Sequence, residues 1–172
     1  MNKSKSQSLK VAFSGLILAI NTIILLLVNI IETNTLALLA LASFCSAIVL
    51  IEFGLKTSIV FSLASILLAF IVLTNKMYFF VYALSFGIYG CIKAIIEKNK
   101  NIKFQYVLKL LYANLVFILL YFISTKLLIM FDMKILYIIV YNFVFIIYDF
   151  IYSQFIEFYY NKIRKRLKID NF

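Results

Sequence analysis

Six apolar stretches follow one another along the chain, and the short polar connections between them limit the possible folds most strongly. Each stretch approaches the roughly 20 apolar residues that a helix needs to cross a lipid bilayer. We expect spans over residues 10–31, 36–51, 57–74, 77–96, 104–128 and 135–160, followed by a basic tail over 161–172. The sequence therefore predicts an all-α polytopic membrane bundle of six transmembrane helices, which forms a single domain over residues 1–172.

The composition agrees with a membrane protein and excludes several kinds of site. Of the 172 residues, 65% are hydrophobic and 14% are charged, whereas soluble domains average about 45–50% and about 25%. The chain has no His, which removes the commonest metal ligand and the usual proton shuttle. Cys45 and Cys91 stand alone in apolar runs, which is typical of buried thiols and not of a zinc site. We therefore expect no metal site and no cofactor.

The basic residues indicate the orientation. With the N-terminus inside, 14 of the 17 Lys and Arg residues fall in inner segments, and only Lys76, Lys126 and Lys134 fall outside. Because Lys and Arg concentrate in cytoplasmic loops, both termini are expected to be cytoplasmic, in a multi-pass protein of a cell membrane, most simply the bacterial cytoplasmic membrane. The basic residues line one edge of the bilayer, where anionic lipid attracts them, so we expect lipid and not nucleic acid as the partner.

One carboxylate lies deep in the last span. Counting inward from Ile135 at 1.5 Å per residue, Asp149 lies about 20 Å into the bilayer, in its inner half. Lys93 and Lys109 occupy the same inner zone, so we expect a protein-buried ion pair among Asp149, Lys93 and Lys109. A structural pair or a partner-docking site is the favoured interpretation, and a proton relay is the alternative.

The outer half of the bundle is expected to hold a ligand site instead. Helical periodicity places polar residues of several spans on shared faces, and the outer connections add amides and one lysine. Tyr rings with a few amides suit a small organic ligand. The interhelical Asn residues serve equally well as packing contacts between helices. The candidate substrate-binding residues are Asn29, Glu32, Asn34, Asn75, Lys76, Tyr78, Tyr82, Tyr121, Thr125 and Asn142.

Enzymatic function is not expected. An enzyme in the bilayer would need clustered metal ligands or a nucleophile with its base, and the chain offers only Asp149 and Glu157 in its last span. No GxxxxGK[ST] phosphate-binding loop occurs, so the chain does not use ATP by that route.

The six short-looped helices with both ends inside resemble the substrate-binding S component of energy-coupling-factor (ECF) vitamin transporters. The run VLTNKMYFFVYALSFGIYGCIKAIIEK, from Val72 to Lys98, is also similar to small bacterial proteins grouped with those S components. S components carry an AxxxA motif on the first helix, and its closest match here is Gly15 with Ala19, with Ala12 on the same side. The chain departs from the family where it has Thr74 and Gly90 in place of expected Pro residues.

The resemblance implies a division of labour. The chain would capture a vitamin-like solute from the outer side, and a separate transmembrane coupling subunit with cytoplasmic ATPases would power its uptake. Ala12, Gly15 and Ala19 would then contact the coupling subunit. The alternative function is a non-catalytic assembly or regulatory subunit of another membrane complex, which the inner carboxylates and the small residues of the first span also fit.

Overall fold

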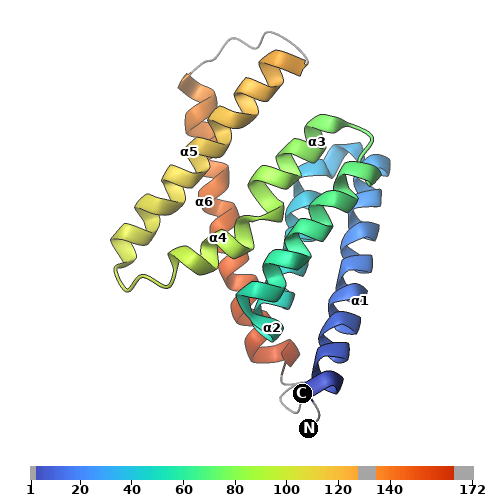
Figure 1. Ribbon diagram of the computed structural model, residues 1–172. Helices are drawn as coiled ribbons and strands as arrows, with labels where there is room; N and C mark the ends of the chain where they lie inside the picture. Colours follow the sequence, from blue (N-terminus) through green and yellow to red (C-terminus); the bar gives the residue numbers. More distant parts are fainter. Residues whose placement is uncertain (1–2, 128–134, 165–172) are drawn as a thin grey trace.

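The computed structural model describes residues 3–127 and 135–164, and within these residues the chain is helical, with no strands (Figure 1). The elements are α1 (Lys3–Ile30), η1 (Glu32–Asn34), α2 (Thr35–Val72), α3 (Lys76–Val81), η2 (Tyr82–Gly87), α4 (Tyr89–Ile96), α5 (Ile102–Leu127), α6 (Ile135–Phe158) and η3 (Tyr159–Ile163). Five stretches of the described chain are long and apolar enough to cross a membrane: Gln7–Ile30, Thr35–Val72, Lys76–Ile96, Ile102–Lys126 and Ile135–Ile163. The chain is therefore consistent with a multi-pass membrane protein.

Helix α2 is not one straight rod. Leu39 and Ala69 belong to the same buried cluster, although a straight helix would hold them about 45 Å apart at 1.5 Å per residue. The helix reverses at Gly54, whose φ of 79° and ψ of 178° are non-helical. Ser58 Oγ then donates to the Ser46 carbonyl at 3.2 Å, which joins the two halves beside the turn.

The reversal falls inside the predicted connection between the second and third spans. We expected spans 36–51 and 57–74, and the structure has a helical segment on each side of Gly54 but extends both segments up to the glycine. A single residue suffices because glycine has no Cβ and tolerates this backbone conformation. The connection between the two helical segments is therefore a single residue, shorter than the polar residues on either side of Gly54 led us to expect.

The first and last described residues lie at the same end of the bundle as this turn. The Phe13 ring of α1 contacts the Phe53 ring edge-on, with centroids 5.5 Å apart. Arg164, directly after η3, lies with its Nε 3.7 Å from Glu52 Oε1. We call this end of the bundle the proximal end, and the opposite end, which holds Asn34 and Asn75, the distal end.

The fourth predicted span contains a wide helical turn. We expected mostly continuous helices, but η2 (Tyr82–Gly87) is π-helical and separates α3 from α4. Such turns insert an extra residue and rotate the side chains that follow them. Beyond it, Gly90 permits a close approach of helices, because a Cβ there would collide with the Tyr152 hydroxyl of α6.

Helices α5 and α6 form a hairpin that leans away from α1, α2 and α3 at the top of Figure 1, the distal end. Asn114 of α5 and Asn142 of α6 join the two helices by reciprocal amide hydrogen bonds of 3.2 and 3.1 Å. Large apolar side chains such as Ile71 and Ile135, each 77% exposed, cover the outside. An exposed surface of this kind is suited to lipid and not to water.

The substitution Gly54→Ala tests the reversal of α2. Its φ and ψ are nearly exclusive to glycine, so we expect the substitution to lower the free energy of unfolding by about 1–3 kcal/mol, through backbone strain alone. Nothing lies within 4 Å of a Cβ at this position, so no steric clash adds to the effect. The measurement is reversible unfolding in mixed micelles.

The matched control is Gly15→Ala, which also has open space around its Cβ but lies within the helical α1. There alanine should stabilise by up to about 1 kcal/mol, since it is the better helix former. Equal stabilisation by both substitutions would contradict a reversal at Gly54.

Candidate functional site

A cluster of charged side chains joins three helices in the proximal half of the molecule. The Asp149 carboxylate of α6 receives hydrogen bonds from Lys93 of α4 and, at 2.9 Å, from Lys109 of α5. Tyr89 donates its hydroxyl to the same carboxylate at 2.5 Å. Glu97 adds a second carboxylate, 3.0 Å from Lys93 and 2.7 Å from Lys109. We call these five residues the ionic cluster.

The cluster is balanced in charge and largely hidden from solvent. The side chains of Lys93, Lys109 and Asp149 are only 2%, 8% and 13% exposed, whereas Glu97 is 38% exposed at the margin. Two cations face two anions, so no net charge is buried. Removing one partner of a buried pair is strongly destabilising, because it leaves the other charge uncompensated. The arrangement therefore acts as a clamp that holds α4, α5 and α6 together.

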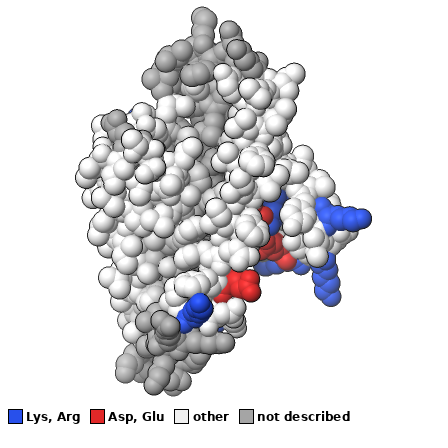
Figure 2. Space-filling model, turned by 180° about the vertical axis from the view of Figure 1, so that it is seen from behind, with Lys and Arg blue, Asp and Glu red and all other residues white. Residues whose placement is uncertain are grey.

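The structure brings together the three residues that the sequence placed in an ion pair. It adds Tyr89 and Glu97, which the sequence reasoning missed although each lies four residues from Lys93, on the same helical face. Ser153 is a further partner, accepting from Lys93 at 2.8 Å. Figure 2 shows acidic and basic side chains meeting in the lower half of one face, while most of that face is uncharged.

Several predicted ligand-binding residues at the distal end make structural bonds instead. Asn29 donates to the Val72 carbonyl at 2.8 Å and accepts from the Thr74 amide at 3.2 Å, so it ties α1 to the end of α2. Asn75 caps α3 by accepting from the Met77 amide at 2.9 Å.

The predicted lysine at this end also has structural partners. Lys76 donates to the carbonyls of Phe70 and Leu73, at 2.8 and 3.3 Å, and its ammonium lies 4.6 Å from the centre of the Phe70 ring. Asn34 is exposed before α2 and makes no capping bond with its side chain, and the structure does not describe the Glu32 side chain.

The remaining predicted residues divide between core and pocket. Tyr82 is buried in a network with Asn21 of α1 and Ser65 of α2, in which its hydroxyl lies 3.1 Å from Asn21 Nδ2 and 2.5 Å from Ser65 Oγ. Tyr78 packs against a core cluster that includes Tyr82, and Asn142 pairs with Asn114 as described above. Thr125 donates to its own helix at Phe122. Of the ten residues predicted for the ligand site, only Tyr121 lines the pocket described next.

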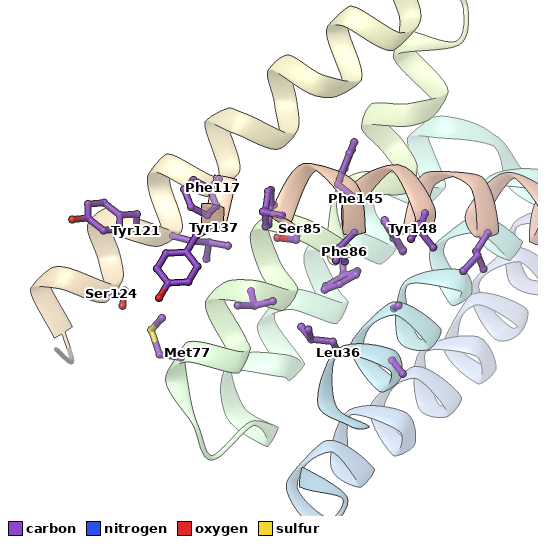
Figure 3. Close-up of a pocket in the computed structure, with 18 of the residues that line it drawn as sticks. Leu36, Met77, Ser85, Phe86, Phe117, Tyr121, Ser124, Tyr137, Phe145 and Tyr148 are labelled. Atoms are coloured by element: carbon purple, nitrogen blue, oxygen red, sulfur yellow. The ribbon is translucent and has the colours of Figure 1, made fainter. Parts of the chain in front are cut away.

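An aromatic pocket of about 560 Å³ lies between the α5–α6 hairpin and the elements α2, α3 and η2 (Figure 3). Its lining comes almost wholly from aromatic and aliphatic side chains: Leu36, Ala37, Ala40, Phe44, Met77, Val81, Ser85, Phe86, Phe117, Leu120, Tyr121, Ser124, Tyr137, Tyr141, Val144, Phe145, Ile147, Tyr148 and Ile151. The volume falls within the range of small-molecule sites. The sequence did not indicate this pocket because its Phe, Tyr and Leu residues look like any lipid-facing residues.

Ser85 is the buried polar residue of this pocket. It is 9% exposed, and its Oγ has no hydrogen-bond partner in the described part of the chain. The Tyr141 hydroxyl is a polar neighbour of the Ser85 hydroxyl, but the two groups do not meet the distance and angle limits of a hydrogen bond. By contrast, the Tyr148 hydroxyl is hydrogen-bonded to Ser43 Oγ at 2.8 Å. The pocket thus offers a ligand one buried hydroxyl.

The small residues of α1 lie on the surface of the described chain. Ala12, Gly15 and Ala19 are exposed, and a Cβ at Gly15 would meet nothing within 4 Å. Among the described residues no group of three or more His, Cys, Asp or Glu is suited to a metal ion.

Comparisons with protein-family models, with curated proteins and with solved structures found no significant match to this chain.

The substitution Asp149→Asn tests the clamp. It leaves Lys93 and Lys109 without the carboxylate that links them, so we expect a loss of about 3–5 kcal/mol in the free energy of unfolding. Glu157→Gln is the control, because Glu157 is an exposed carboxylate on the same helix and should change stability by less than about 0.5 kcal/mol. Denaturant titration of both variants in mixed micelles measures the difference. Equal stabilities would show that the cluster does not hold the helices.

Proposed function

We propose that the chain crosses the bacterial cytoplasmic membrane six times, with both ends in the cytoplasm. The two halves of α2, residues 35–53 and 55–72, are about 29 and 27 Å long at 1.5 Å per residue, close to the thickness of the hydrocarbon core. The proximity of Phe13 and Arg164 to the Gly54 turn supports an even number of crossings. The concentration of Lys and Arg on one side supports the orientation.

In this orientation the chain captures a small organic solute from the outer side and presents it for uptake. The observation that carries this proposal is the aromatic pocket, which lies toward the distal end and is lined by side chains from α2, α3, η2, α5 and α6. Pockets of this size and apolar lining, with a polar group that fixes the ligand, are typical of small-molecule sites.

Separate subunits power the uptake, as the resemblance to ECF S components implies. The exposed Ala12, Gly15 and Ala19 support a contact with a transmembrane coupling subunit, because small side chains leave room for a partner helix to approach closely. The coupling subunit in turn binds cytoplasmic ATPases.

The alternative function is an assembly or regulatory subunit of another membrane complex. The same exposed face of α1 favours it, since a subunit of that kind also needs a contact surface. The two functions differ in the pocket, which only the first one requires.

Filling the pocket distinguishes the two. Ala37 is exposed and lines the pocket, so Ala37→Phe places a ring inside it without disturbing the core. We expect mass spectrometry of the purified wild-type protein to find a retained small molecule, and Ala37→Phe to lose it. Val60→Phe, on the exposed outside of α2 and away from the pocket, should retain it.

Cells that depend on the chain for growth should likewise lose growth with Ala37→Phe and keep it with Val60→Phe. Unchanged growth with Ala37→Phe, together with identical small molecules in all three proteins, would contradict solute capture and support the assembly subunit.

A further inference from the structure

The described lining of the aromatic pocket limits the charge of its ligand. Among the residues that the structure describes, 3–127 and 135–164, none that lines the pocket is Lys, Arg, Asp or Glu. The ionic cluster lies outside the pocket, and its charges are already paired with one another. A carboxylate, phosphate or ammonium placed in the pocket would be desolvated with no counter-charge, at a cost of several kcal/mol. The pocket is therefore unfavourable for a charged ligand.

The aromatic rings limit the shape of the ligand. Figure 3 shows Phe117, Tyr121 and Tyr137 at one end of the pocket and Phe86, Phe145 and Tyr148 toward the other. Flat rings on both sides contact a planar or ring-bearing body over a large area and bind it mainly through burial of apolar surface.

The unpartnered hydroxyl of Ser85 specifies the polar part of the ligand. Ser85 shares η2 with Tyr82, yet Tyr82 bonds Asn21 and Ser65 in the core while Ser85 lines the pocket. A buried hydroxyl without a partner costs about 1–3 kcal/mol, which a ligand group that bonds it would recover. One hydrogen-bonding group on the ligand is enough to do so.

We infer that the aromatic pocket binds an uncharged, lipophilic, ring-bearing solute that carries one hydrogen-bonding group, which meets Ser85 Oγ. The inference rests on the proposed function and names the substrate class of the same site. It differs from the sequence-based expectation, in which a lysine and several amides recognised a polar ligand. Such a solute dissolves in the outer leaflet of the bilayer, beside the α3, α5 and α6 side chains that line the pocket.

Photolabelling with matched probes tests this inference. The three probes share one phenyl-diazirine body with a short alkyl arm, which ends in a hydroxyl, a carboxylate or a trimethylammonium group. The wild-type chain is labelled in lipid nanodiscs, and the labelled residues are mapped by peptide mass spectrometry. Ser85→Ala, Ala37→Phe and the outside control Val60→Phe are treated in the same way.

We expect the hydroxyl probe to label pocket residues saturably, and an unlabelled alcohol of the same shape to compete. Both charged probes should label these residues about tenfold less or weaker still. Ser85→Ala should weaken labelling by the hydroxyl probe about fivefold, the effect of one lost hydrogen bond, without lowering the thermal stability of the protein. Ala37→Phe should abolish the labelling, and Val60→Phe should leave it unchanged.

Three results would overturn the inference. Stronger saturable labelling by a charged probe would show a charged substrate, and solute capture itself would stand if Ala37→Phe abolished that labelling. Full labelling by the hydroxyl probe in Ser85→Ala would remove the role of that hydroxyl. Labelling that no alcohol displaces, and that Ala37→Phe does not alter, would show that bilayer lipid occupies the space. Loss of the retained small molecule, by contrast, tests the proposed function independently of these probes.

Discussion

The arrangement of the helices depends on one carboxylate. Asp149 of α6 holds lysines from α4 and α5, so a single side chain fixes three helices relative to one another. In a membrane such a contact is hard to exchange for another, because lipid offers no alternative partner for the charges. The ionic cluster lies in the proximal half and fixes α5 and α6 relative to α4, which follows η2 in the chain. The aromatic pocket lies between the α5–α6 hairpin on one side and α2, α3 and η2 on the other, so the clamp and the pocket belong to one arrangement.

The same lack of partners in hydrocarbon explains where most of the other polar side chains lie. Asn21, Ser65 and Tyr82 bond one another between α1, α2 and η2, and Asn114 bonds Asn142 between α5 and α6. These bonds satisfy groups that would otherwise cost several kcal/mol each in lipid. They also leave those residues unavailable to a ligand. Ser85 differs from them because its hydroxyl is buried, lines a pocket and has no partner among the described residues.

The sequence predicted the apolar stretches and the grouping of Asp149 with Lys93 and Lys109, because helical length, spacing and depth follow directly from residue numbers. It placed a connection between the spans 36–51 and 57–74, where Gly54 lies, but it did not predict that a single glycine makes the reversal. It also did not predict the wide turn of η2, since both features depend on backbone conformation and not on polarity. It also did not identify the pocket. Periodicity places Tyr82 and Ser85 near one face of a regular helix. In the structure both residues lie in the wide turn η2, where Tyr82 bonds Asn21 and Ser65 in the core and Ser85 lines the pocket. Asn29 and Asn142 looked like ligand contacts because their bonds to other helices are invisible without the packing order.

The distance between the two sides of the aromatic pocket, measured with and without the Asp149 carboxylate, tests this account most directly. Spin labels on cysteines introduced at positions 34 and 125, both exposed at the distal end, report that distance by double electron–electron resonance spectroscopy. The native cysteines are first removed by Cys45→Ala and Cys91→Ala. With Asp149 present, the account predicts one narrow distribution, which Asp149→Asn broadens and Glu157→Gln leaves unchanged. The same distribution in all three proteins would contradict the claim that the ionic cluster fixes the α5–α6 hairpin and thereby shapes the pocket.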